Sequence, residues 1–158
     1  MTHEEIMART IKLANENVQK GLWPFSTIIT RNGEIIAEAV NSVLISHDPS
    51  DHAEIAAIRI ATKKLKTSNL SDCTMYVVGL PCPMCLTCIL FSKMTNIVYA
   101  VDVSTKDKAL QKLPLTDSLY KLISDNYASN ALNYKHLSDF SKEGESLFIK
   151  WNKNNEFK

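Results

Sequence analysis

The sequence contains no apolar run as long as the roughly 18 residues that a membrane-spanning helix needs. It has only 4 glycines and 5 prolines in 158 residues, too few for a collagen-like or low-complexity chain. Neither sign of charge is in excess, because 18 Lys and Arg side chains stand against 17 Asp and Glu. A formal charge of +1 gives no global attraction to nucleic acid or to an anionic membrane, and so favours a small or neutral ligand.

Cysteine is also scarce, and its placement is informative. Three of the 4 cysteines fall within residues 82–88, as Cys-x-x-Cys-x-x-Cys, and the fourth is Cys73. Disulfide frameworks of secreted domains usually spread their cysteines over the fold, so this cluster argues against one. Residues 2–20 read as a periodic helix rather than as an apolar leader. We therefore expect a reduced, cytoplasmic protein whose clustered cysteines bind metal.

The spacing of apolar and turn residues predicts one domain of alternating helices and strands. Helices are predicted over 3–20 and 82–93 and between Asp48-Pro49 and residue 65, with Ser50 or Asp51 as the cap of this middle helix. Strands are predicted over 25–30, 34–41, 74–78 and 96–101, and Asn32-Gly33 closes a hairpin between the first two. This order predicts a sheet covered by helices on both faces. A short helix around 117–124, a strand within 130–137 and a C-terminal helix or tail from about 139 complete the prediction.

Two short motifs carry the chemistry. The segment "SDHAEIAAIRIATKKL" (50–65) places His52 and Glu54 at the start of a helix, and "PCPMC" (81–85) places Cys82 and Cys85 at the start of another. One imidazole and two thiolates suit Zn²⁺, and three protein ligands leave a fourth position for water, as in catalytic zinc sites. Helix N-termini stabilise thiolates, and Glu54 can act as the general base and acid of a hydrolysis.

Each motif alone also has an ordinary explanation. A single His-x-Glu is usually a solvated helix face, and a single Cys-x-x-Cys can be a redox pair or half of a structural site. The run of cysteines also invites an iron–sulfur interpretation, but such a cluster normally needs four thiolates in an irregular loop. Cys88 falls further along a predicted helix and Cys73 beyond a strand, so we interpret both as small buried hydrophobic residues.

The sequence resembles the zinc-dependent cytidine deaminase-like superfamily, with its CMP/dCMP-type zinc-binding deaminase domain. The resemblance rests on "HAE" at 52–54 and "PCPMC" at 81–85. The segments "PFSTIITRNGEIIAEAVN", "HDPSDHAEIAAIR" and "DCTMYVVGLPCPMCLTCILF" follow in the order of its purine-acting branch, most similar to bacterial guanine deaminases and next to tRNA adenosine deaminases. This resemblance covers nearly the whole chain. It implies a three-layer αβα sandwich with a mixed five-stranded sheet, a single domain over residues 1–158, and one zinc ion per chain held by His52, Cys82 and Cys85.

The resemblance also implies roles for individual residues. Glu54 shuttles protons, and Asp117 on a later short helix assists proton transfer to the leaving amine. The expected contacts with the base come from the Phe25 ring, the Asn41 side chain, the Ala53 backbone N–H and the Phe91 ring. Without the resemblance, these side chains read as core aromatics, a turn asparagine and a helix-capping aspartate.

Three departures from the family pattern fall near the expected pocket. Leu80 stands where a glutamate usually precedes the Pro-Cys-x-x-Cys motif, and Ser26-Thr27 stand where glycine and alanine usually follow the pocket phenylalanine. Asp51 replaces the small residue that commonly precedes the zinc histidine. Side chains added at such positions reshape a pocket, so substrate specificity is the property most affected.

The expected activity is hydrolytic deamination of a purine base, with guanine converted to xanthine and ammonia. The resemblance further implies a homodimer in which the C-terminal segment, with Phe157, reaches the partner's site. A tRNA-specific adenosine deaminase stays open, although it needs basic residues around the pocket and the C-terminal "KWNKNNEFK" has lysines but no arginine. A deaminase of another nucleobase or nucleoside, such as cytosine, and a non-catalytic zinc-binding relative stay open as well. The presence of Glu54 argues against the non-catalytic relative.

Overall fold

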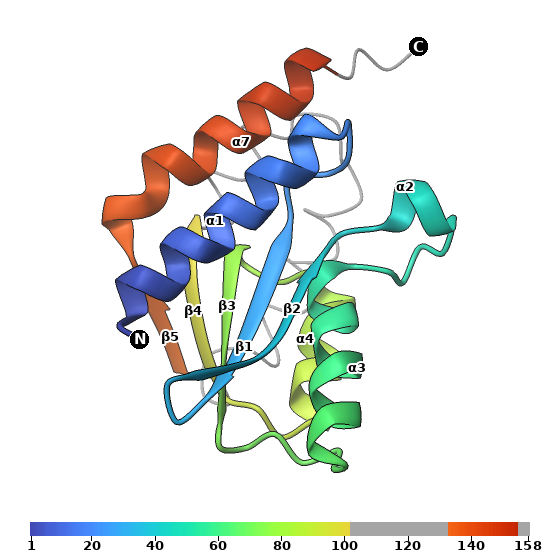
Figure 1. The fold of residues 1–158 in the computed structure, drawn as a ribbon, viewed down its shortest axis with the longest axis vertical. Helices are drawn as coiled ribbons and strands as arrows, with labels where there is room; N and C mark the ends of the chain where they lie inside the picture. Colours follow the sequence, from blue (N-terminus) through green and yellow to red (C-terminus); the bar gives the residue numbers. More distant parts are fainter. Residues whose placement is uncertain (102–132, 155–158) are drawn as a thin grey trace.

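The computed structural model describes residues 1–101 and 133–154, which fold around one mixed sheet of five strands (Figure 1). The strands are β1 (Ser26–Arg31), β2 (Glu34–Val40), β3 (Cys73–Gly79), β4 (Asn96–Val101) and β5 (Asn133–His136), in the order β2-β1-β3-β4-β5. β1 runs antiparallel to β2 and to β3, whereas β3, β4 and β5 are parallel. The predicted mixed five-stranded sheet is therefore confirmed.

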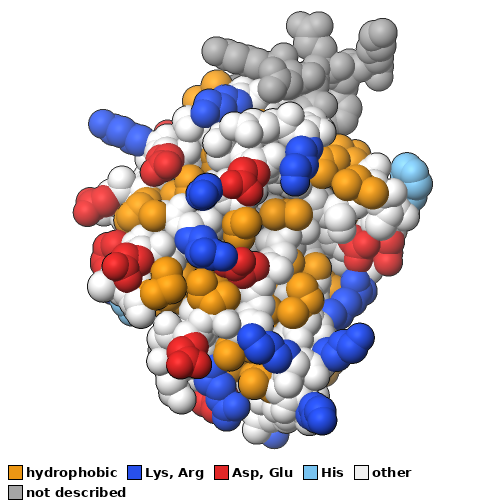
Figure 2. All heavy atoms as spheres, in the orientation of Figure 1, with side chains coloured by type: hydrophobic (Ala, Val, Ile, Leu, Met, Phe, Trp, Pro, Cys, Tyr) orange, Lys and Arg blue, Asp and Glu red, His pale blue; other side chains and the backbone are white. Residues whose placement is uncertain are grey.

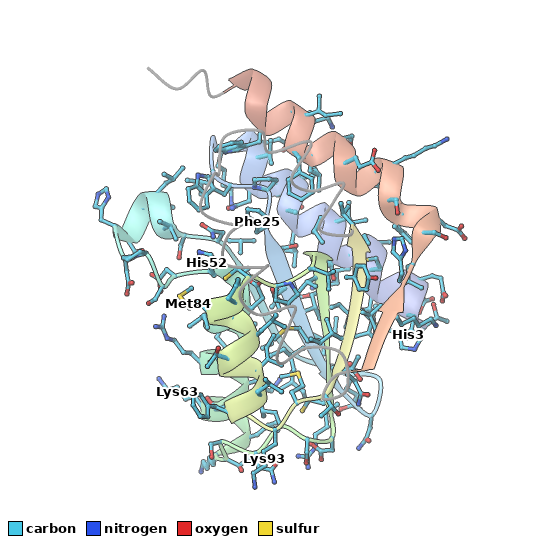
Figure 3. The ribbon with its side chains drawn as sticks, turned by 180° about the vertical axis from the view of Figure 1, so that it is seen from behind. His3, Phe25, His52, Lys63, Met84 and Lys93 are labelled. Carbon is cyan, nitrogen blue, oxygen red and sulfur yellow. The ribbon has the colours of Figure 1, made fainter. Side chains whose placement is uncertain are left out.

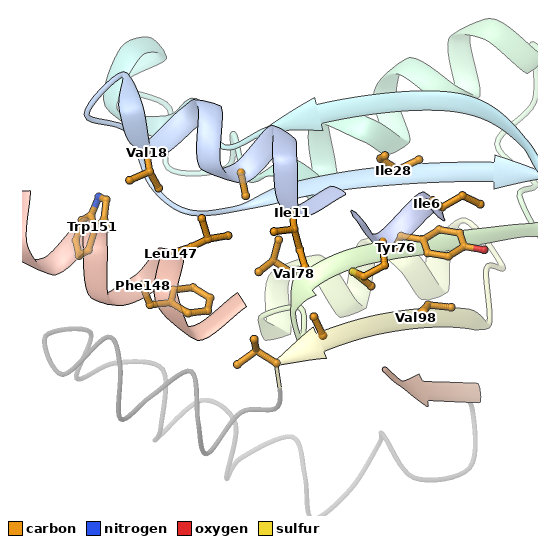
Figure 4. Packing of buried hydrophobic residues seen from close by; sticks show 14 residues of the cluster. Ile6, Ile11, Val18, Ile28, Tyr76, Val78, Val98, Leu147, Phe148 and Trp151 are labelled. Atoms are coloured by element: carbon orange, nitrogen blue, oxygen red, sulfur yellow. The ribbon is translucent and has the colours of Figure 1, made fainter. Parts of the chain in front are cut away.

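Helices cover both faces of this sheet. α1 (His3–Gln19) and α7 (Ser141–Asn154) lie on one face, and α3 (Ala53–Leu65) and α4 (Pro83–Phe91) lie on the other (Figure 1). Leu147, Phe148 and Trp151 of α7 pack with residues of α1 and the sheet in one hydrophobic cluster, which Figure 4 shows from close by. A second cluster joins α3 and α4 to the opposite face. The expected three-layer αβα architecture is confirmed.

The local signals that define the first hairpin and helix act as the sequence predicts. Thr2 and Glu5 form a reciprocal capping box at the start of α1, and Gly21 follows its end with a φ of +77°. Asn32 and Gly33 join β1 to β2 with φ angles of +51° and +77°, the left-handed region that a tight hairpin turn requires. A bulge between Ile29 and Thr30 shifts the register of this pair.

The prediction that Ser50 or Asp51 caps α3 is wrong, because His52 occupies the N-cap position. The two expected residues are used elsewhere: the Ser50 N–H donates to the Asp48 carboxylate at 2.8 Å, and the Asp51 carboxylate accepts from Arg59 at 2.7 Å. α4 likewise begins at Pro83, with Cys82 as its N-cap, and ends at Phe91 rather than at 93. Both metal-binding motifs therefore fall at helix N-termini.

The C-terminal helix approaches the sheet closely at one position. Gly144 is buried, and a Cβ atom placed on it would lie 2.5 Å from Cγ2 of Val101. Only glycine allows α7 to sit at this distance from β4 without displacing a stiff β-branched side chain. α2 (Val43–Ser46) and the 3₁₀ helix η1 (Ser138–Phe140) are short elements that the sequence did not predict. The helix predicted around 117–124 lies outside the described residues.

None of the helices in the described parts of the chain is both long and apolar enough to span a bilayer. Acidic and basic side chains are interspersed on the molecular face that Figure 2 shows. Basic side chains are the more frequent in the lower part of that view, although the chain as a whole is near neutral.

Candidate active site

His52, Cys82 and Cys85 meet where α3 and α4 begin. The His52 Nδ1 atom lies 3.6 Å from each of the two sulfurs, and the sulfurs lie 3.5 Å from one another. Figure 3 shows His52 and Phe25 near one end of the sheet and Lys93 at the other. Among residues 1–101 and 133–154, this is the group of histidine, cysteine and acidic side chains close enough together to hold a metal ion.

The dimensions of this triangle fit a tetrahedral zinc ion. With Zn–S bonds of about 2.3 Å and Zn–N bonds of about 2.0 Å, tetrahedral geometry requires ligand atoms to be roughly 3.5–3.8 Å apart. The two observed N–S separations of 3.6 Å and the S–S separation of 3.5 Å fall within this range, the S–S distance at its short end, with one nitrogen and two sulfurs as donors. Three ligands leave a fourth position open, so the residues fit a catalytic rather than a closed structural zinc site.

The environment at the start of α4 favours the thiolate form of Cys82 and disfavours that of Cys85. The hydrogen bond between the two sulfurs, with the nearby His52 ring, lowers the pKa of Cys82 well below that of a free thiol. The same sulfur–sulfur contact raises the pKa of Cys85, and burial and the Glu54 carboxylate act in the same direction. A cation between the two sulfurs would stabilise both as thiolates, so that ionisation of Cys82 would no longer oppose that of Cys85.

Glu54 reaches the metal-binding group. It lies in the first turn of α3, two residues after His52, and only 8% of its surface is exposed. The Glu54 carboxylate contributes to raising the pKa of the Cys85 thiol, so it lies near that ligand sulfur. A buried carboxylate beside a metal ligand is suited to proton transfer.

The loop before His52 is held by its own hydrogen bonds. The His52 N–H donates to the Ser50 carbonyl at 2.8 Å, and the Ser42 N–H donates to the Asp51 carbonyl at 3.1 Å. Arg59, two turns along α3, fixes the Asp51 side chain from outside. Asp51, which departs from the family pattern, therefore closes this loop instead of pointing its charge at the metal ligands.

Asn41 follows β2 at the same end of the sheet and is 2% exposed. Its backbone N–H donates to the Phe25 carbonyl at 2.9 Å, and its side-chain Oδ1 accepts from the Val43 N–H at 3.2 Å. Within the described residues its Nδ2 has no hydrogen-bond partner. The side chain is therefore fixed by its oxygen and leaves N–H donors available to a ligand.

Sequence reasoning missed Asn17, which supports Asn41 from behind. The buried Asn17 Nδ2 donates to the carbonyl of Trp23 at 2.8 Å and to the carbonyl of Asn41 at 3.0 Å. The available signal was a polar residue on the apolar stripe of α1, between Ala14 and Val18. Such a residue must find partners when it is buried.

Of the other residues predicted to contact the base, Ala53 lies beside a metal ligand and Phe25 packs against α7. Ala53 is buried at the first position of α3, beside the metal ligand His52. The Phe25 ring is half-buried and packs against Phe148 of α7, with ring centroids 5.5 Å apart. The structure thus ties Phe25 to the cluster around α1 and α7 as well as to the end of the sheet where the ligands lie.

The structure does not bring Phe91 to the metal-binding group. It is the last residue of the nine-residue α4, six residues after Cys85, which places it roughly 9 Å along the helix axis from that ligand, and it is 83% exposed. The metal ligands lie toward the opposite end of the helix, so the role of Phe91 as a pocket residue stays a prediction. Asp117 and Phe157 lie outside the described residues.

The remaining cysteines do not join the metal group. Cys73 begins β3, whereas the metal motif follows the end of that strand, and burial raises the pKa of Cys73 to about 11. Cys88 is half-buried on α4, and burial raises its pKa too. The described residues thus provide no four-thiolate arrangement for an iron–sulfur cluster.

Known proteins share both this sequence pattern and this fold. Guanine deaminase of Bacillus subtilis is 43% identical over 103 residues, which are 65% of this chain and 66% of that protein. The tRNA-specific adenosine deaminase of Aquifex aeolicus is 35% identical over 100 residues, 63% of this chain and 66% of its own length. Each alignment therefore spans just under two-thirds of the relative. A solved structure of the B. subtilis guanine deaminase superposes with a TM-score of 0.70 at 33% identity, covering 100% of this chain and 98% of that one.

The family model that matches this sequence is described as MafB19-like deaminase and covers residues 1–133. The match includes all three candidate metal ligands and Glu54. The fold, the spacing of the motifs and this match agree with one another. The chain belongs to the MafB19-like deaminase family, within the cytidine deaminase-like fold.

Proposed function

We propose that this protein is a zinc-dependent hydrolytic deaminase of a purine base and that guanine, converted to xanthine and ammonia, is its substrate. The observation that carries the proposal is the set of His52, Cys82 and Cys85 at a spacing that fits tetrahedral zinc, with the buried Glu54 in the helical turn that follows His52. A purely structural zinc site has no use for such a carboxylate. The similarity to a guanine deaminase supports the choice of base.

The described residues can supply the proton transfers of the reaction. A zinc ion held by His52, Cys82 and Cys85 would lower the pKa of a water molecule toward neutrality and polarise it for attack. Glu54 is placed to take a proton from that water and to deliver it to the ring nitrogen next to the carbon under attack. It then takes the second proton from the hydroxyl that has added to the carbon and passes it to the departing amino group, so that water is consumed and ammonia is released. We propose Asp117 as a second proton donor in this last step.

The base is proposed to bind beside Asn41 and Phe25. Asn41→Ala is expected to lower kcat/KM for guanine by ~10-fold or more, because it leaves a polar edge of the substrate unpaired in a buried site. Steady-state kinetics on the zinc-loaded variant measures this effect. Asn15→Ala, on α1, is a matched control that removes an asparagine away from the site. Equal kcat/KM for the Asn41 variant and the unmodified protein would exclude Asn41 from substrate binding.

A tRNA-specific adenosine deaminase is the second candidate, because a relative of that activity is 35% identical. The arginines argue against it. The chain has three, and each pairs with a carboxylate: Arg9 with Glu38, Arg31 with Asp72, and Arg59 with Asp51. None of these guanidinium groups is left to contact an RNA phosphate without first giving up its partner.

The two candidates separate in one experiment. Ammonia release is measured with guanine, adenine, cytosine, their nucleosides and a tRNA anticodon hairpin, at low and at physiological salt. We expect release from guanine with little dependence on salt, since no phosphates are neutralised. Deamination of the hairpin with steep salt dependence, and no reaction with guanine, would replace the purine-base proposal with the RNA one.

We also propose that the protein is a homodimer. In the described residues α7 packs on its own chain, so exchange of the C-terminal segment would involve residues after 154. α4 carries no charged residue, and its Met84 and Phe91 are exposed at 40% and 83%. Sedimentation equilibrium should therefore give about twice the chain mass, and Phe91→Asp should shift it toward the monomer. A monomer mass for the unmodified protein at micromolar concentration contradicts this proposal.

A further inference from the structure

The adjacent residues Ser26 and Thr27, which depart from the family pattern, point to opposite faces of the sheet. The Ser26 hydroxyl donates to the Thr10 carbonyl of α1 at 2.5 Å, so its polar group is satisfied on the α1 face. Thr27 shares its face with Ile29, which packs in the cluster formed with α3 and α4. This is the face on which the metal ligands lie.

The Thr27 hydroxyl is buried without a hydrogen-bond partner in the described parts of the chain. The residue is 0% exposed, and its Oγ1 makes no hydrogen bond to residues 1–101 or 133–154. A buried hydroxyl without a partner costs free energy, so native proteins rarely keep one without a reason. Its low exposure does not exclude Thr27 from substrate binding, because the candidate site residues Cys85 and Asn41 are themselves only 0% and 2% exposed.

The strand register places Thr27 close to the strand ends that lead to Asn41 and to the Cys82 motif. Its neighbours across the sheet are Ala39 of β2 and Val77 of β3. Two residues beyond Ala39 the chain reaches Asn41, and two residues beyond Val77 it reaches Gly79, which leads into the Cys82 motif. Thr27 therefore pairs with the residue two positions before Asn41, on the same face of the sheet. The Asn41 Nδ2 is likewise buried without a partner among the described residues.

We propose that the Thr27 hydroxyl and the Asn41 amide together bind the acceptor edge of an oxopurine, which makes Thr27 a specificity-determining residue. The unpartnered Nδ2 of Asn41 offers donors, while its Oδ1 already accepts from the Val43 N–H, and the Thr27 hydroxyl adds a second donor. Guanine presents two adjacent acceptors, N7 and O6, whereas adenine presents one acceptor and one amino group. The inference rests on the proposed deamination of a purine base and assigns a residue and an edge to it.

Three variants test this role. Thr27→Val keeps the shape and removes the hydroxyl, Thr27→Ser restores the hydroxyl, and Ser26→Ala removes the neighbouring hydroxyl on the α1 face. We expect Thr27→Val to lower kcat/KM for guanine by ~10-fold, mainly through KM, and Thr27→Ser to recover most of it. The thermal midpoint of Thr27→Val should not fall, because an unpartnered hydroxyl is replaced by a methyl group. Ser26→Ala should lower the midpoint and leave kcat/KM unchanged.

The opposite pattern overturns the inference. If Thr27→Val has unmodified kcat/KM and a lower midpoint, the hydroxyl serves stability through a buried water and does not meet the substrate. Equal losses in Thr27→Val and Thr27→Ser would assign the effect to side-chain shape. Failure of the proposed function is distinguishable, since the unmodified zinc-loaded protein would then release no ammonia from guanine, and the inference would fall with it.

Discussion

Glu54→Gln is expected to lower turnover by at least ~10²-fold while the protein keeps about one zinc ion per chain. Glutamine preserves the size and hydrogen-bonding atoms of the buried side chain but cannot carry a proton between water and the leaving amine. Such a loss corresponds to about 2.7 kcal/mol of transition-state stabilisation. Single-turnover kinetics and elemental analysis on the same preparation measure both quantities.

The control for this variant is Glu38→Gln, which neutralises a carboxylate of β2 that pairs with Arg9. Its turnover should match that of the unmodified protein. Because Glu54 influences the ligand Cys85, the zinc content of Glu54→Gln decides how its loss of activity is interpreted. Full activity in Glu54→Gln would remove this residue from the mechanism, and loss of zinc together with activity would show a role in metal binding instead.

Cys85→Ser is expected to lose most of the bound zinc and, with it, the activity. The sulfur lies 3.6 Å from His52 Nδ1 and 3.5 Å from the Cys82 sulfur, so its removal leaves a two-ligand site. A serine hydroxyl is a poor zinc ligand at neutral pH, because it stays protonated. Dialysis against a weak chelator followed by elemental analysis should find about one zinc ion per unmodified chain and little in the variant.

Cys88→Ser provides the matched control, since Cys88 lies three residues further along the same helix and outside the metal group. Its zinc content should be unchanged. Loss of zinc from Cys88→Ser would indicate that Cys88 is also a metal ligand. A zinc-free protein that retained full activity would contradict the metal assignment altogether.

The metal group could be predicted from the sequence because each half is local. His52 and Glu54 share one turn of α3, Cys82 and Cys85 share one turn of α4, and the turn signals before each helix fix where those turns begin. The long-range step, that the two helix starts meet, followed from the resemblance. The strand order that brings them together depends on β1 pairing with β3, which no local signal specifies.

The roles of the buried polar residues around the site could not be predicted, because they depend on which helix packs on which face of the sheet. Ser26 and Thr27 are equivalent departures in the sequence, yet one donates to α1 and the other is buried toward α3 with no partner in the described chain. No role was predicted for Asn17, although its side chain donates to the carbonyl of Asn41. His52 took the N-cap position that Ser50 or Asp51 was expected to fill, because those residues close the preceding loop.

The most direct test of the proposed function is the conversion of guanine by the purified zinc-loaded protein, with xanthine, ammonia and bound zinc quantified together. We predict equal amounts of xanthine and ammonia, at a rate that falls to the background when a chelator removes the zinc and recovers when zinc is restored. A protein that holds one zinc ion per chain and releases no ammonia from guanine or any other purine base would contradict the proposal.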